Sequence, residues 1–97
     1  MYNTHQIINI LANQKKELEK KFPISEMALF GSYARGDFNE HSDIDILVDF
    51  NKRIDGFDYI RIAHVLEDIF QHKIDLVSRK GIKPQYLSYV EKDLIHV

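Results

Sequence analysis

The chain has 97 residues, of which 44% are hydrophobic and 29% are charged, and it contains no cysteine. This length suits one hydrophobic core, so we expect a single domain over residues 1–97. The lack of cysteine excludes a disulfide framework, a thiolate zinc site and a cysteine nucleophile. A formal net charge of −2 argues against direct nucleic-acid binding, which needs a basic face to neutralise phosphates. We see no leader segment and no long apolar run, and therefore expect a cytoplasmic protein that does not bind membranes.

Residues 4–22 show helical periodicity, with Lys and Glu between the apolar positions. The apolar residues at this spacing are Ile7, Ile8, Leu11, Leu18 and Phe22. Thr4 is the predicted N-cap, and Pro23 is expected to stop the helix because it restricts the residue before it. The segment therefore predicts an amphipathic helix.

Two predicted strands with a loop between them come next. Residues 27–30 form a short apolar run that ends at Gly31, which is typical of a buried strand. Residues 31–42 contain two glycines and many turn formers, so we predict a loop with one helical turn starting near Ser32. Residues 42–50 alternate between apolar and largely acidic positions, and this alternation predicts a strand with an acidic face.

The second half of the chain predicts one more strand between two helices. Asp55 is the predicted start of a helix, with Asp58 three residues later in a position that resembles a capping box. Residues 72–77 predict a third strand, and Pro84 suits the first turn of a short last helix. Residues 94–95 could form a final strand or cap the core.

Together these elements predict an α+β fold with two layers. Three strands form one small mixed sheet, and the helices most simply pack on one face of it. The opposite face is then left to carry chemistry.

Carboxylates on two strands are the first candidate site. Asp43 and Asp45 are two residues apart on a strand, so their side chains project from the same face. Asp75 lies on another predicted strand and, like Asp45, has an apolar residue on each side. Three such carboxylates could hold two Mg²⁺ ions, the arrangement that clamps both oxygens in phosphoryl transfer. Each acid taken alone is more simply a solvated surface group.

The Gly31-Ser32 turn is the second candidate site. Gly31 permits a positive φ and a close approach of a ligand to the backbone. If a helical turn begins at Ser32, its free N–H groups and the hydroxyl could bind a phosphate, and Arg35 could reach the same group. Without the carboxylates, the glycine would be an ordinary turn residue and the arginine a solvated one.

In combination these motifs resemble a known family. Gly31-Ser32, ten residues, then Asp43-x-Asp45 matches the G-S-x10-D-x-D pattern of the polymerase-beta-type nucleotidyltransferases. The surrounding sequence resembles the minimal nucleotidyltransferases (MNT) along the whole chain. The resemblance implies the polymerase-beta-like fold, with Gly31 and Ser32 holding a nucleoside triphosphate and Asp43 and Asp45 binding metal. Asp75 would be the third acid, which helps to activate the acceptor hydroxyl.

The resemblance also implies an acceptor. Relatives that modify antibiotics carry a further helical domain, and this chain is too short to include one. MNT proteins commonly act as antitoxins of a helical HEPN toxin. The resemblance therefore implies Mg²⁺-dependent transfer of AMP from ATP to a hydroxyl, that of a tyrosine, on such a partner. A homodimer or a complex with the toxin is a reasonable assembly.

A hypothesis from a different class stays open. The chain could be a non-catalytic binding module that neutralises the toxin by covering its active site. The two hypotheses differ in whether neutralisation needs nucleotide and Mg²⁺. The sequence does not indicate which nucleotide is used or how many monophosphates are transferred.

Overall fold

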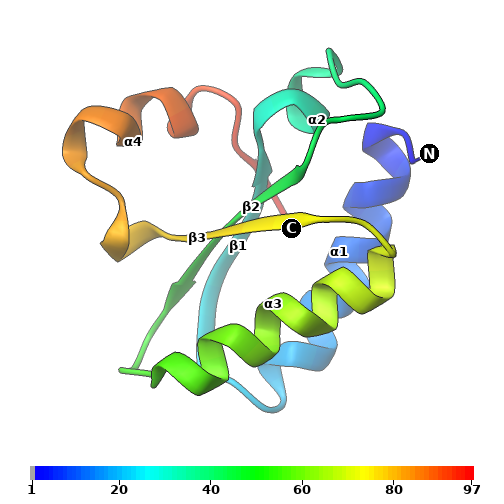
Figure 1. Ribbon diagram of the computed structural model, residues 1–97. Helices are drawn as coiled ribbons and strands as arrows, with labels where there is room; N and C mark the ends of the chain where they lie inside the picture. Colours follow the sequence, from blue (N-terminus) through cyan, green and yellow to red (C-terminus); the bar gives the residue numbers. More distant parts are fainter. Residues whose placement is uncertain (1) are drawn as a thin grey trace.

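A four-stranded mixed sheet carries the fold in the computed structural model, which describes residues 2–97 (Figure 1). The elements in chain order are α1 (Thr4–Glu19), β1 (Ile24–Phe30), α2 (Gly31–Arg35), β2 (Ile44–Phe50), α3 (Gly56–Phe70), β3 (Ile74–Ser78), the 3₁₀ turn η1 (Arg79–Gly81), α4 (Pro84–Glu91) and β4 (Ile95–His96). The strand order is β3-β2-β1-β4. β1 is antiparallel to β2 and β4, whereas β2 and β3 are parallel. The end of the chain, left open from the sequence, is therefore a fourth strand.

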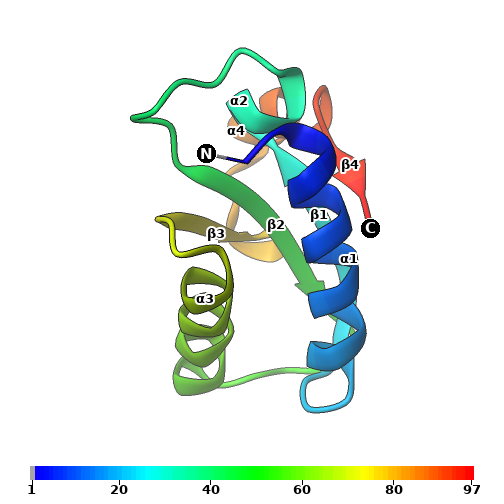
Figure 2. The ribbon, with the colours of Figure 1, turned by 90° about the vertical axis from the view of Figure 1, so that its right-hand side faces the viewer.

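The two long helices cover one face of the sheet, as predicted. In Figure 2, α1 and α3 lie in front of the strands, and α4 is behind them. Alternate side chains of β1, β2 and β3 meet the apolar stripes of α1 and α3 in one core. The fully buried side chains that α1 and α3 bring to it include Ile7, Leu11, Ile62 and Leu66. Burying such side chains is the main stabilising contribution to a domain of this size.

The short helix α4 lies on the other side of the sheet. Ala28 and Leu47 point to that side and are fully buried, although they lie outside the core under α1 and α3. The link to α4 is polar, because Arg79 donates hydrogen bonds both to Glu26 of β1 and to Glu91 of α4. This face is therefore partly covered rather than open.

The start of α1 corrects one sequence prediction. Asn3 is the N-cap, not Thr4: the Asn3 side chain accepts from the Gln6 backbone, and the Gln6 side chain accepts from the Asn3 backbone in return. The Thr4 hydroxyl instead donates to the Tyr33 carbonyl, which ties α1 to α2. None of the helices in residues 2–97 combines the length and apolar character that crossing a membrane requires.

Candidate active site

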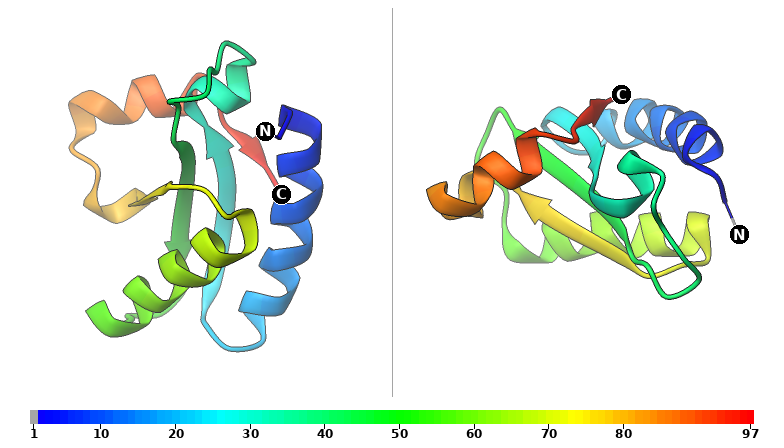
Figure 3. Two further views of the ribbon diagram at one scale, coloured as in Figure 1. Left: turned by 45° about the vertical axis from the view of Figure 1, so that its right-hand side comes forward. Right: turned by 90° about the horizontal axis from the view of Figure 1, so that it is seen from above.

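The register of the sheet brings the predicted acids together on the face opposite α1 and α3. Asp45 of β2 is paired with Asp75 of β3 on one side and with Phe30 of β1 on the other. Asp43 lies two residues before Asp45 and projects to the same side. Because β2 and β3 are parallel, Asp45 and Asp75 both lie near the start of their strands, at the same end of the sheet. Figure 3 (right) looks down on this end, over which α2 lies.

The carboxyl of Asp45 is under electrostatic strain. Its pKa is raised from 3.8 to about 6; burial is the largest cause, and the negative charge of Asp75, which is within hydrogen-bonding reach, is the next. Asp43 contributes in the same direction, while the more distant Arg35 opposes it. Close carboxylates that resist ionisation in this way are the arrangement that a bound cation relieves.

Gly31 lies directly against the Asp45 carboxylate. Its φ is +74°, in the region that favours glycine. A Cβ at this position would also come within 2.1 Å of Asp45 Oδ2, closer than real Cβ contacts allow. Glycine is therefore required here for two reasons: its φ is positive, and Asp45 Oδ2 occupies the space that a Cβ would need. This contact joins the Gly31-Ser32 turn to β2.

The predicted helical turn is α2, and it begins at Gly31 rather than at Ser32. Within residues 2–97 no side chain caps its first turn, so these backbone N–H groups remain able to bind an anion. Ser32 occupies the second position of this helix, directly after Gly31, which contacts Asp45. We call Asp43, Asp45 and Asp75 the acidic row.

Arg35 follows at the end of α2, where acidic partners hold it. Its guanidinium donates to Asp37 at 3.1 Å and to Asp93 at 3.0 Å, and both contacts raise its pKa. A pocket of about 190 Å³ opens beside it, between Gly31 and residues of α4. The structure therefore places Arg35 next to Gly31 but engages it with two carboxylates.

Comparison with known proteins decides the family. Residues 11–96 match the family model described as a nucleotidyltransferase domain. The chain belongs to the nucleotidyltransferase domain family. The resemblance inferred from the Gly-Ser and Asp-x-Asp motifs is confirmed, and so is the predicted enzyme class.

Relatives of this nucleotidyltransferase match it from end to end. The protein adenylyltransferase MntA of Thermococcus cleftensis is 35% identical over 97 residues, which cover 100% of this chain and 98% of the relative. A protein of Methanocaldococcus jannaschii, named as a candidate protein adenylyltransferase, is 41% identical over 100 residues and covers all of both chains.

Solved structures share the fold. A structure described as a candidate minimal nucleotidyltransferase has a TM-score of 0.82 and 26% identity, and covers 99% of this chain and 97% of its own. The MNT antitoxin complexed with a tri-AMPylated HEPN toxin of Shewanella oneidensis gives a TM-score of 0.63 at 22% identity, over 97% of this chain and 67% of that one. The predicted α+β fold is confirmed by these likenesses.

The acidic residues of this nucleotidyltransferase fit a magnesium site that substrate helps to complete. Within residues 2–97 no three His, Asp or Glu side chains are gathered closely enough to hold a metal ion by themselves. One reason is that Asp43 turns toward Lys73, with Nζ 3.7 Å from Oδ2. Mg²⁺ is commonly bound by one or two carboxylates, with substrate phosphates and water as the other ligands. The strained Asp45–Asp75 pair provides that number of carboxylates.

A second polar cluster on the same face has no signal in the sequence. Glu26 accepts a bidentate pair of hydrogen bonds from Arg79, at 2.6 and 2.7 Å, and lies 2.6 Å from His96. The Arg79 contacts lower the pKa of Glu26 to about 2, against the opposing effect of burial. This cluster joins β1, η1, α4 and β4. It therefore fixes η1, α4 and β4 against β1 on the face of the sheet that carries the candidate active site.

Proposed function

We propose that this nucleotidyltransferase transfers AMP from ATP to a tyrosine hydroxyl of a HEPN-type toxin and thereby acts as its antitoxin. The proposal rests on one observation above others: Asp45 is held between Gly31 and Asp75 with its pKa raised to about 6. A surface acid without a cationic partner would not need this arrangement. The end-to-end likeness to a named protein adenylyltransferase supports the same reaction.

Each residue has a place in the proposed chemistry. Gly31 and Ser32 hold the triphosphate through backbone N–H groups and the hydroxyl. Asp45 and Asp75, together with Asp43 and substrate oxygens, would hold Mg²⁺, which would supply positive charge to the phosphate groups. The acceptor oxygen attacks the α-phosphorus, the bond from that atom to the bridging oxygen breaks, and pyrophosphate leaves. The proton of the acceptor hydroxyl passes to the Asp75 carboxylate.

Arg35 has a conditional role in this proposal. Its planar fork suits a phosphate of the leaving pyrophosphate. In the structure the fork is engaged by Asp37 and Asp93. A triphosphate that reaches Arg35 must therefore compete with two carboxylates.

The proposed acceptor comes from the structural neighbours. A structure with the same fold is an MNT antitoxin bound to a HEPN toxin that carries three AMP groups. We propose the same partner class and the same AMP group for this chain. We also propose a cytoplasmic location, because ATP is present there.

The competing hypothesis is an antitoxin that only binds. Exposed aromatic side chains of α4 favour it: Tyr86 and Tyr89 are 56% and 67% exposed, and Tyr89 lines the small pocket beside Gly31 and Arg35. These rings could contact a partner without any chemistry.

A labelling experiment separates the two hypotheses. A HEPN-domain protein chosen as the candidate partner is incubated with this chain, Mg²⁺ and ATP that is labelled at either the α- or the γ-phosphate. AMP transfer predicts label on the partner from the α-phosphate only, and none with Asp45→Asn. Asp68→Asn removes an exposed acid from α3 and should label as the unmodified chain does. Toxin neutralised without ATP, without Mg²⁺ and without label would establish the binding-only antitoxin.

A further inference from the structure

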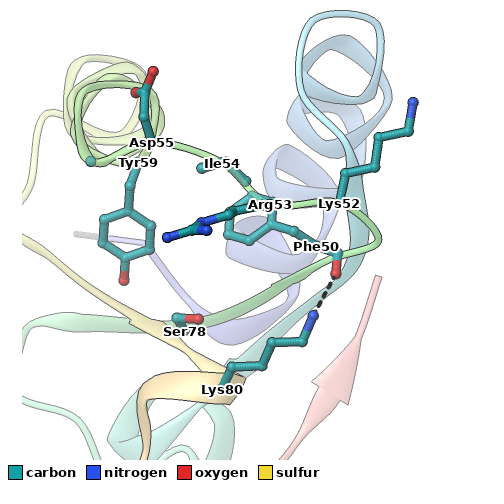
Figure 4. A pocket seen from close by; sticks show the side chains of 9 residues that line it. Phe50, Lys52, Arg53, Ile54, Asp55, Tyr59, Ser78 and Lys80 are labelled. Carbon is teal, nitrogen blue, oxygen red and sulfur yellow. Dashed lines mark hydrogen bonds between the residues drawn. The ribbon is translucent and has the colours of Figure 1, made fainter.

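A second polar pocket lies at the far end of the sheet, where β2 and β3 end. Its volume is about 530 Å³, and Phe50 and Ser78 mark the strand ends that line it (Figure 4). Phe50 follows Asp45 by five residues along β2, which puts the pocket roughly 16 Å from the acidic row at the usual strand rise. The pocket is therefore separate from the proposed AMP-transfer site.

Positive charge is concentrated in this pocket, although the whole chain has a net charge of −2. Lys52, Arg53 and Lys80 line it, and within residues 2–97 the first two have no carboxylate at ion-pair distance. Lys80 donates to the Phe50 carbonyl at 3.1 Å and lies 3.8 Å from Asp49. The one acid of the lining, Asp55, is engaged as the N-cap of α3 through the Asp58 backbone N–H at 2.8 Å.

Aromatic side chains form the wall of the pocket. The rings of Phe50 and Tyr59 meet edge to face, with centroids 6.4 Å apart. The Tyr59 hydroxyl donates to the Leu76 carbonyl at 2.7 Å, which fixes the orientation of the ring. In Figure 4 the Arg53 guanidinium points toward the Tyr59 ring, and Ser78 lies below both. Aromatic rings and a guanidinium without a carboxylate partner in residues 2–97 thus line the same pocket.

We propose that this pocket binds a phosphate-bearing ligand of mononucleotide size. The phosphate lies between Arg53 and Lys80 and accepts a hydrogen bond from Ser78, because a guanidinium fork and an ammonium together suit a doubly charged phosphate. The flat body of the ligand packs on Tyr59 and Phe50. This assignment does not depend on the AMP-transfer proposal, since it uses none of the residues of that site.

An NMR titration tests the pocket, because backbone amide signals separate it from the active site. Inorganic phosphate, AMP and adenosine are titrated separately into the labelled chain without divalent cations. Phosphate and AMP should produce saturable shifts at the amides of Arg53, Gly56, Ser78 and Lys80. AMP should bind more tightly than phosphate, and adenosine should bind weakly, because it has the ring but not the charge.

Charge-removing variants complete the test. Arg53→Gln with Lys80→Gln should weaken phosphate and AMP binding at this pocket by about tenfold or more, the usual effect of losing charge-assisted hydrogen bonds. Lys16→Gln with Lys83→Gln removes the same charge outside the pocket lining and should leave the affinity unchanged. Shifts that do not saturate, or that persist in the pocket variant, would overturn the site. AMP binding no tighter than phosphate would overturn the assignment of the aromatic wall.

Discussion

Replacing Asp45 by asparagine should stabilise the folded chain while it removes AMP transfer. The pKa of Asp45 rises from 3.8 to about 6 on folding, so the folded chain holds this proton more tightly than the unfolded chain. Stability then falls as the pH rises from about 4 to about 6, because ionisation costs more in the folded state. Asparagine has the same shape, cannot ionise, and its amide can donate to Asp75 in place of the proton.

The size of the effect follows from the pKa difference. One pH unit corresponds to about 1.4 kcal/mol, which sets a ceiling of about 3 kcal/mol. Asp45 is only half-buried, so screening by water reduces the expected gain to about 1–2 kcal/mol at neutral pH. For a chain of this size that gain corresponds to a rise in Tm of about 5–10 °C.

Urea unfolding between about pH 4 and pH 8, without divalent cations, measures this gain. The difference in free energy of unfolding between Asp45→Asn and the unmodified chain should be near zero below about pH 4 and reach its plateau above about pH 6. Asp68→Asn, at an exposed acid on α3, should change stability by less than about 0.5 kcal/mol. An Asp45→Asn chain that is less stable at neutral pH, or a gain that does not vary with pH, would refute the electrostatic reasoning.

Three further predictions use other contacts of the same face. Gly31→Ala should abolish AMP transfer and cost more stability than Gly36→Ala. Both changes place alanine at positive φ, at a cost of about 1–3 kcal/mol, but only Gly31→Ala displaces the Asp45 carboxylate. Asp93→Asn should lower the KM for ATP a few-fold by releasing Arg35, whereas Arg35→Gln should raise it. Glu26→Gln should destabilise the chain by about 1–2 kcal/mol at neutral pH, an effect lost as the pH falls from about 4.5 toward 2, since the folded-state pKa is depressed.

These predictions are checked by kinetics with ATP and by denaturant unfolding. Equal losses of stability and activity in Gly31→Ala and Gly36→Ala would contradict the contact with Asp45. An unchanged or higher KM for ATP in Asp93→Asn would show that Arg35 does not exchange its carboxylates for phosphate. A Glu26→Gln effect of the same size at all pH values would mean that packing, not the ion pairs with Arg79, accounts for it.

Local patterns in the sequence were sufficient to predict that Asp43, Asp45 and Asp75 face the same side of the sheet. Strand alternation alone put Asp43 and Asp45 on one face, because successive side chains in a strand must point in opposite directions. The shared apolar pattern around Asp75 indicated the same face of another strand, and the parallel register places Asp75 beside Asp45. The four-strand order needed the structure, since β4 has two residues and no alternation to detect.

Contacts between distant segments could not be predicted in this way. Arg35 and Asp93 are 58 residues apart, and Glu26 and Arg79 are 53 apart, with no pattern that relates them. The position of α4 was equally hidden, because none of its side chains is fully buried and its docking depends on these polar contacts. The sequence showed that Gly31 permits an unusual φ, but not that Asp45 occupies the space of its Cβ.

The most direct test of AMP transfer is the intact mass of a candidate HEPN-domain partner after incubation with this chain, ATP and Mg²⁺. We expect an increase of one or more AMP units with the unmodified chain and none with the Asp43→Asn, Asp45→Asn double variant. An unchanged partner mass, with the partner bound and inhibited all the same, would contradict catalysis and leave the chain as a binding antitoxin.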